Sequence, residues 1–249
     1  MLDVVYPVRF GESNESLRYS LRSLARFGKN IRRVWLVGYA PSWVTNVECI
    51  RLEQTADKWL NTRHNIETAC RCGLISDDFI MFNDDFILTR PVTDWVEFCN
   101  VYRGTLWEKE CEYIRLDNPN EWQRGFHDTR QLCILCGVKD EPLDYELHHP
   151  VIFNRELRLN LFKLKETQRF RYISDPLIFQ RSLYLNLYPD KNPPKRIFDR
   201  KLFGDIIDSS FTDNGCFSVT SHLIGNHKRA PRLHQWLETT LSQKCIFER

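Results

Sequence analysis

A short apolar run followed at once by two acidic residues is the feature that most constrains how this chain folds. Residues 79–82, Phe-Ile-Met-Phe, have the length and composition of a buried strand. Asn83, Asp84 and Asp85 follow where that strand should end, and residues 86–88 resume the apolar pattern. Two adjacent carboxylates beside a core cost solvation free energy unless a cation, donors or water receive them. The pattern therefore predicts a polar site at the edge of a sheet.

Such a site has two interpretations. Hard divalent cations such as Mg²⁺ and Mn²⁺ prefer oxygen ligands of this kind, and a bound cation can in turn hold a diphosphate. Residues 83–85 also favour turns, so a solvated turn is the alternative. The immediate return to apolar residues makes a fully solvated loop less natural.

Strand and helix patterns alternate over the first ninety residues. This alternation predicts an α/β sheet with helical crossovers. Ligands of such sheets gather beyond the carboxyl ends of the strands, so Arg9, Asp84 and Asp85 are expected on one edge. The predicted strands are 3–8, 33–37, 47–52 and 79–82, and the predicted helices are 15–27 and 61–72.

The pattern is looser after residue 94. We predict a helix at 95–102, a strand at 112–116 and a polar loop at 117–130. Residues 155–187 alternate basic and apolar positions and are predicted to be helical, and a closing helix is expected at 231–241.

The composition is that of an ordinary soluble globular protein, with 42% hydrophobic and 27% charged residues among 249. No run approaches the roughly 20 apolar residues that span a bilayer. The first residues lack the basic region that begins a signal peptide. Nine cysteines form an odd, irregularly spaced set, so no disulfide framework is expected and a cytoplasmic location is predicted.

The net charge of +2 is unevenly spread. Residues 155–201 hold twelve Lys or Arg and five Asp or Glu, a balance of +7, which leaves −5 for the remainder. Such a segment either binds a polyanion, for example nucleic acid, or is a solvated face.

Four segments in a fixed order resemble the second conserved block of the Stealth proteins, which are sugar-phosphate transferases of capsule synthesis and lysosomal-enzyme tagging. The segments are residues 14–24, 31–37, 40–43 and 79–85. His149-Pro150 and the basic region after it are similar to the third Stealth block. The first block is represented only by residues 3–9, and the fourth is not recognisable.

The resemblance implies a fold close to that of GT-A glycosyltransferases, which bind a nucleotide-sugar and a divalent cation above the strand ends. It implies a nucleotide-sugar and metal-binding core at 1–150. Residues 151–249 would be a basic, mainly helical acceptor-side region packed on that core.

Site residues follow from that implied fold. Asp85, with Asp84 beside it, is the expected ligand of Mn²⁺ or Mg²⁺, and Asn83 is expected to position the sugar. A histidine from the C-terminal segment would add a ligand, and His227 is our choice over His222; a surface location is the alternative for both.

Further contacts to base, ribose or phosphate are expected from Arg9, Arg63 and Asn65. The planar guanidinium of arginine suits phosphate because it bonds two oxygens at once.

An acceptor hydroxyl needs a base, and the segment 144–150 concentrates candidates. His149 matches the histidine of the third Stealth block, and Asp144 or Glu146 is the carboxylate alternative. A core histidine held by a backbone carbonyl is the competing interpretation of His149.

Cys133 and Cys136 have zinc-ligand spacing, which His127, His148 or His149 would have to complete. A buried strand over 132–138 with small cysteine side chains explains the pair equally well.

Three functions are compatible with these features. The first is a metal-dependent glycosyltransferase whose acceptor is a modified base in DNA, as in some phage enzymes. The second is a Stealth-type transfer of a sugar-1-phosphate to a saccharide. The third is a nucleic-acid-binding protein on an inactive GT-A core, in which aromatic residues of 155–201 stack on bases. The sequence points to no obligate protein partner.

Overall fold

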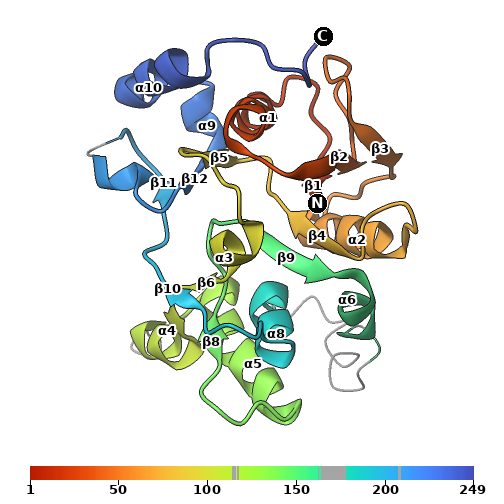
Figure 1. Ribbon diagram of the computed structural model, residues 1–249. Coiled ribbons are helices and arrows are strands. Elements are labelled where there is room, and N and C mark those ends of the chain that lie inside the picture. Colours follow the sequence, from red (N-terminus) through yellow and green to blue (C-terminus); the bar gives the residue numbers. More distant parts are fainter. Residues whose placement is uncertain (114–115, 117, 162, 164–177, 207–208) are drawn as a thin grey trace. The chain divides into compact units, whose positions relative to one another are not determined.

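A computed structural model describes residues 1–113, 116, 118–161, 163, 178–206 and 209–249 (Figure 1). The chain forms two compact units. The first contains residues 1–99, 148–155 and 199–249, and the second contains residues 100–147 and 156–198. Among the described residues, no helix is both long and apolar enough to cross a membrane.

A five-stranded sheet organises the first unit, with the strand order β3-β2-β1-β4-β9. The first four strands in this order run parallel, and β9 pairs antiparallel with β4. The chain builds outward from β1 to β3, then crosses back to place β4 on the other side of β1. The strands are β1 (Leu2–Val8), β2 (Ile31–Gly38), β3 (Glu48–Arg51), β4 (Asp78–Met81) and β9 (Val151–Asn154).

Helices α1 (Glu15–Phe27) and α2 (Lys58–Arg71) make the crossovers and lie on opposite faces of this sheet (Figure 1). Asn14 caps α1 by accepting the backbone N–H of Leu17 at 3.1 Å. Alternate residues of β1 point to the α1 face, where Val4, Tyr6 and Val8 join the core that contains the apolar face of α1. Because both faces are covered, the strands read as nearly continuous apolar runs.

A smaller three-stranded sheet lies in the same unit. Its strands are β11 (Lys201–Leu202), β12 (Cys216–Val219) and β5 (Phe86–Leu88), and β12 runs antiparallel to β5. Ile87, Phe217 and Val219 pack with the apolar faces of α9 (Ser221–Ile224) and α10 (Pro231–Leu241). The unit also contains α3 (Trp95–Cys99) and the short 3₁₀ turn η1 (Ser209–Thr212).

The last residues of the chain are tied to α1 by one carboxylate. Glu248 accepts hydrogen bonds from Arg22 at 2.7 and 2.9 Å and from Arg18 at 3.0 Å. Burial alone would raise the pKa of Glu248, yet the bonds from Arg22, the backbone of Cys245 and Arg18 lower it to about 2. The two arginines of the polar face of α1 are therefore structural.

The second unit is mainly helical. The Asn120 cap and Gln123 close a capping box at the start of α5, and α5 packs against α4 and α8. Its helices are α4 (Leu106–Tyr113), α5 (Glu121–Leu135), α8 (Gln180–Leu187) and all but the first residue of α6 (Arg155–Leu161); its strands are β6 (Val101–Tyr102), β7 (Gly104–Thr105), β8 (Leu143–Asp144) and β10 (Lys195–Arg196).

The α/β class with helical crossovers is confirmed, and the predicted bounds of α1 and α10 match the structure. The polar loop predicted at 117–130 is wrong, because α5 begins at Glu121 and buries Phe126, Leu132 and Cys133 along one face. The strand predicted at 112–116 is also wrong at 112–113, which end α4. Residues 162 and 164–177 of the helix predicted at 155–187 lie outside the described residues, and α6 and α8 form at its ends.

The two units divide the chain differently from the predicted boundary at residue 150. Residues 148–155 return to the first unit because β9 pairs with β4, and residues from 199 onward add β11 and β12 beside β5. Residues 151–249 therefore contain the strands β9, β10, β11 and β12 in addition to helices.

We expect Glu248→Gln to lower the free energy of unfolding at pH 7 by about 2 kcal/mol, because it leaves two arginines without a carboxylate. The native pKa of about 2 lies below the ordinary value of 4.5. The stabilisation is therefore complete above about pH 4.5 and is lost as the pH falls towards 2. Urea unfolding should show the difference between variant and wild type shrinking over that range.

Glu53→Gln is the matched control, because Glu53 is exposed. It should change stability by less than about 0.5 kcal/mol. A Glu248→Gln effect that persists unchanged below pH 3 would contradict this role for the carboxylate.

Candidate functional site

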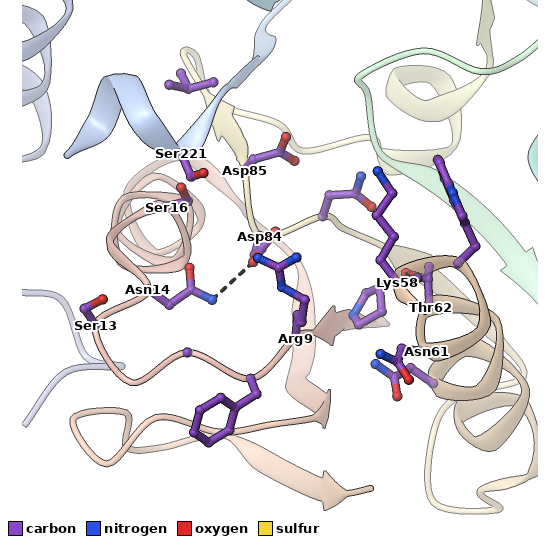
Figure 2. Close-up of a pocket in the computed structure, with 17 residues that line it drawn as sticks. Arg9, Ser13, Asn14, Ser16, Lys58, Asn61, Thr62, Asp84, Asp85 and Ser221 are labelled. Atoms are coloured by element: carbon purple, nitrogen blue, oxygen red, sulfur yellow. Dashed lines mark hydrogen bonds between the residues drawn. The ribbon is translucent and has the colours of Figure 1, made fainter. Parts of the chain in front are cut away.

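A polar pocket of about 480 Å³ lies beyond the carboxyl ends of β1 and β4 (Figure 2). This is the point where the strand order reverses, which is the usual place for a ligand in an open α/β sheet. The pocket is bounded by five segments: residues 7–11 after β1, 13–16 at the start of α1, 58–65 on α2, 83–85 after β4, and 219–221 between β12 and α9.

The predicted acids lie in this pocket and also form a turn. The backbone N–H of Phe82 still pairs with Val5 O at 2.9 Å, and the N–H of Phe86 closes the turn on Asn83 O at 3.2 Å. Phe82 and Phe86 are both fully buried, so they anchor the two ends of the turn. Asn83, Asp84 and Asp85 all line the pocket, so the turn and the polar site coexist.

The carboxyl group of Asp84 has a raised pKa. Burial first, and then the neighbouring charge of Asp85, raise the pKa of Asp84 to about 6, although Asn14 and Arg9 oppose the rise. Asn14 donates from Nδ2 to Asp84 Oδ2 at 3.1 Å (Figure 2). A cation between the two carboxylates would remove the repulsion that disfavours their ionised forms.

Asp85 connects the pocket to the smaller sheet. Its Oδ2 accepts the hydroxyl of Ser218 at 2.7 Å, and its backbone carbonyl accepts the N–H of Val219 at 3.1 Å. These two bonds fix the carboxylate at the pocket edge and leave its other oxygen without a hydrogen bond to the residues that the structure describes.

The cationic side chains of the pocket are Arg9 and Lys58. Arg9 is exposed and lies beside Asp84 in Figure 2, whereas Lys58 reaches in from the first turn of α2. Asn65 lines the wall formed by α2, and its role in substrate binding stays a prediction. Arg63 is half-buried on the same helix and is not among the residues that line the pocket.

The described residues contain no group of three or more His, Cys, Asp or Glu side chains that could hold a metal ion. The pair Asp84 and Asp85 nevertheless suits Mg²⁺ or Mn²⁺, because such ions are often bound through one or two carboxylates together with water and substrate phosphates. The donor set therefore fits a cation that arrives with a phosphate ligand.

The structure separates the two histidines considered as additional ligands. His227 is exposed, stacks on His234 with 3.7 Å between ring centroids, and is not among the pocket-lining residues. His222 directly follows Ser221, which lines the pocket.

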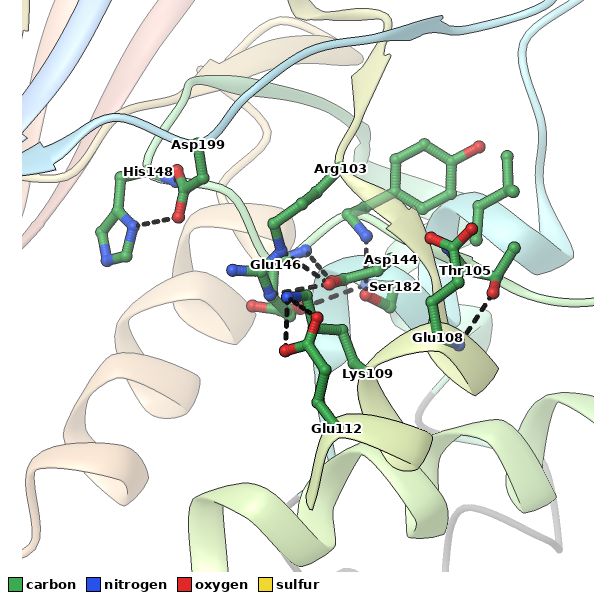
Figure 3. Close-up of polar contacts among 12 residues, drawn as sticks. Arg103, Thr105, Glu108, Lys109, Glu112, Asp144, Glu146, His148, Ser182 and Asp199 are labelled. Carbon is green, nitrogen blue, oxygen red and sulfur yellow. Dashed lines mark hydrogen bonds and ion pairs between the residues drawn. The ribbon is translucent and has the colours of Figure 1, made fainter. Parts of the chain in front are cut away.

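Asp144 and Glu146 belong to the second unit, where both make structural contacts (Figure 3). Asp144 is fully buried and pairs with Arg103 at 2.6 Å. Burial raises the pKa of Asp144, and the Arg103 charge opposes the rise. Glu146 accepts the backbone N–H groups of Arg181 and Ser182 at 3.0 and 3.2 Å, which are orphan donors at the start of α8.

His149 is buried in the first unit. Its Nδ1 lies 3.4 Å from the carbonyl of Pro150, and its ring lies against Phe98 with 4.4 Å between centroids. These contacts are those of the alternative interpretation, a core histidine beside a backbone carbonyl.

The adjacent His148 has more reactive surroundings, which sequence reasoning missed. Its Nδ1 lies 2.8 Å from Asp199 Oδ2 (Figure 3). Its Nε2 lies 3.0 Å from Lys201 Nζ. The backbone N–H of His148 also donates to Asp199 Oδ1 at 2.8 Å. Asp199 and Lys201 are some fifty residues further along the chain, so no short sequence motif predicts that they contact His148.

This cluster is linked to Asp85 through the smaller sheet, although none of its three residues is among those that line the pocket. Lys201 pairs in register with Ser218, and Ser218 holds Asp85. Burial, and then the charges of Asp85 and more weakly Asp199, raise the pKa of the Cys216 thiol, so both carboxylates act on the same buried atom.

Cys133 and Cys136 lie at the end of α5 and not in a strand. Burial raises the pKa of Cys133 to about 12, which disfavours the thiolate that zinc requires. Together with the absence of a third ligand in the described part of the chain, this argues against a zinc site.

No protein-family model matches the sequence, and no curated protein matches it. Solved structures with similar folds include the galactosyltransferase LgtC in complex with donor and acceptor sugar analogs, at 11% identity and a TM-score of 0.46 over 75% of this chain and 70% of that one. An active-site mutant of LgtC aligns at 13% identity and 0.44, over 74% and 69%. The apo glycosyltransferase GlyE of Streptococcus pneumoniae aligns at 12% and 0.41, over 80% of this chain and 45% of its own.

We expect Asp144→Asn to lower the free energy of unfolding by about 3 kcal/mol, because it leaves the half-buried Arg103 guanidinium without its counter-charge. Urea unfolding measures the change. Glu112→Gln, which alters an exposed ion pair with Lys109, is the control and should cost less than about 1 kcal/mol. Unchanged stability of Asp144→Asn would return this carboxylate to the list of reactive candidates.

Proposed function

We propose that this protein is a metal-dependent glycosyltransferase that binds a nucleotide-sugar in the pocket between β1, β4 and α2. The observation that carries the proposal is the pair Asp84 and Asp85, two adjacent carboxylates facing a polar pocket where the strand order of a parallel sheet reverses. The Stealth-like order of segments in the first ninety residues supports it independently.

In the donor complex, Asp84 and Asp85 would hold Mn²⁺ or Mg²⁺. His227 is the third ligand predicted from sequence, and His222, which follows the pocket-lining Ser221 in the chain, is the other candidate. The cation supplies charge neutralisation for the departing nucleotide. Arg9 and Lys58 line the same pocket and contact phosphate oxygens, and Asn83 positions the sugar.

We assign the acceptor base to His148, in place of the predicted His149, Asp144 or Glu146. With its Nδ1 proton directed to Asp199, His148 has Nε2 as its proton acceptor. Lys201 Nζ now donates to Nε2, and the acceptor hydroxyl takes the place of that ammonium. The acceptor oxygen loses its proton to Nε2 and bonds to the anomeric carbon, whose bond to the nucleotide phosphate breaks. The electron pair of that bond leaves with the nucleoside diphosphate.

A Stealth-type transfer of a sugar-1-phosphate is the second candidate, supported by the same segments. In that reaction the acceptor oxygen attacks phosphorus, and the bond between the two phosphates breaks. The released nucleotide distinguishes the two reactions, because glycosyl transfer releases a diphosphate and sugar-phosphate transfer releases a monophosphate.

A modified base in DNA remains a proposed acceptor, with the basic segment 155–201 as its support. Three of the basic residues in that segment have internal roles: Arg155 bonds the carbonyls of Cys70 and Ile75, Arg158 is fully buried, and Arg181 bonds the carbonyl of Leu147. Lys165, Arg169 and Arg171 lie outside the described residues. The charge available to a polyanion is therefore smaller than the sequence count of +7.

DNA as acceptor, or nucleic-acid binding by an inactive core, requires affinity that falls steeply with salt, because bound phosphates release counterions. Binding of a duplex with hydroxymethylated cytosine should then exceed binding of the plain duplex. Salt-independent, weak binding would favour a saccharide acceptor.

Asp85→Asn should abolish turnover, by at least about 10²-fold, and should remove the rise in melting temperature that Mn²⁺ and the donor produce together. The fold should persist, because the amide oxygen that replaces the carboxylate can still accept the Ser218 hydroxyl. A panel of nucleotide-sugars with Mn²⁺, followed by thermal melting and by chromatography of the released nucleotide, makes the measurement. Asp140→Asn, on an exposed carboxylate of the second unit, is the control. Full activity after EDTA treatment of the wild type would refute the metal assignment.

His148→Ala should lower turnover by about 10²-fold while leaving donor binding intact, because it removes the base and not the phosphate contacts. His149→Ala should act mainly on stability, since it removes a ring from the core beside Phe98. Steady-state kinetics and melting temperatures separate the two effects. The reverse pattern, with His149 controlling turnover, would restore the sequence-based assignment.

A further inference from the structure

The wall of the pocket formed by α2 carries a buried amide that the fold itself does not use. Asn65 is 3% exposed and lines the pocket, and its side chain makes no hydrogen bond to any residue that the structure describes. The amide atoms are not among the fully enclosed polar atoms that lack a partner, so they reach the pocket, where water or a ligand can supply their hydrogen bonds.

Two other polar side chains on the same wall form hydrogen bonds within the protein. Asn61, one helical turn earlier, accepts the backbone N–H of Thr55 at 2.9 Å and donates to the Thr55 carbonyl at 2.8 Å. Thr62 donates its hydroxyl to the Lys58 carbonyl at 3.0 Å. Beside the cationic Lys58, Asn65 is therefore a polar group of this wall that is available to a ligand.

The packing of Asn65 indicates which end of the amide is available. A Cβ atom on Gly38 would lie 2.6 Å from Asn65 Nδ2 and would also clash with the Val8 carbonyl, so the amide nitrogen is turned towards the edge of the sheet. Gln54 fills the remaining space there by donating to the Val8 carbonyl at 2.7 Å and accepting the N–H of Phe10 at 2.8 Å. The carbonyl oxygen Oδ1 is the end left to the pocket.

From this arrangement we infer that Asn65 selects the nucleobase of the donor by accepting a ring N–H through Oδ1. Uracil, thymine and guanine carry such a proton beside a carbonyl, and cytosine and adenine do not. The inference rests on the proposed function and adds the chemical class of the nucleotide.

Two exposed aromatic rings border the same pocket and can bind any nucleobase by stacking, without distinguishing one base from another. Phe10 is 70% exposed with its ring against Tyr39 at 4.7 Å, and Trp59 is 50% exposed. Stacking on an aromatic ring tolerates every base, because each base has a π face. Discrimination between bases therefore depends on the amide.

Calorimetric titration of UDP, GDP, CDP and ADP in the presence of Mn²⁺ tests the assignment. In the wild type, UDP or GDP should bind at least about tenfold more tightly than CDP and ADP, since a site built around an acceptor disfavours bases without the proton. Asn65→Leu should reduce that preference to within about threefold. Its melting temperature should change little, because the substitution breaks no hydrogen bond to the described residues.

Asn61→Leu is the matched variant. It should lower the melting temperature, because it breaks three hydrogen bonds to Thr55, and the folded protein should keep the base preference. Equal binding of all four nucleotides by the wild type would overturn the role of Asn65 and leave the proposed function standing. A loss of stability in Asn65→Leu with the preference retained would also overturn it. Failure of all four nucleotides to bind would overturn the proposed function, and this inference with it.

Discussion

The parallel pairing of β4 with β1 is the constraint on which the rest of the first unit depends. Asp3, Val4 and Val5 pair with residues 79–81, and β2 occupies the other side of β1. Since β1 has neighbours on both sides, its end and the end of β4 open onto one shared edge. The crossover helices then approach that edge from opposite faces, so residues from α1 and α2 meet residues that follow the strands. The pocket is a consequence of strand order.

Two hydrogen bonds made by the adjacent acids join three distant parts of the chain. Asp84 is tied to Asn14, which also caps α1, and Asp85 is tied to Ser218 on β12. The position of Asp84 therefore depends on the N-terminal cap of α1, and the position of Asp85 depends on the register of the smaller sheet. For the same reason the acids cannot retreat from each other, and their mutual repulsion is maintained until a cation or a proton relieves it.

Much of this unit was predictable because its signals are local. The apolar runs of β1 and β4, the cap at Asn14 and the acids after Phe82 each lie within a few residues of the structure they specify. Helix α5 was not predicted, since its polar stretch resembles a loop unless the Asn120 and Gln123 capping box is recognised. The pairing of His148 with Asp199 is beyond sequence reasoning of this kind, because only the folded chain brings the two together.

Two aspartates at opposite ends of the same sheet, Asp3 buried and Asp84 half-buried, differ in how completely the protein satisfies them. Asp3 accepts bonds from Arg32, Trp35 and the backbone of Ser76, and these bonds lower its pKa although burial alone would raise it. Asp84 receives one bond from Asn14, and its pKa rises to about 6. The protein thus supplies Asp3 with several donors but leaves Asp84 with few, next to the carboxylate of Asp85. The Asn65 amide, which bonds no described residue, lines the same pocket. Polar groups left in this state destabilise the empty protein, and a bound cation and nucleotide would reverse that cost. Ligand binding at this edge of the sheet should therefore stabilise the folded protein.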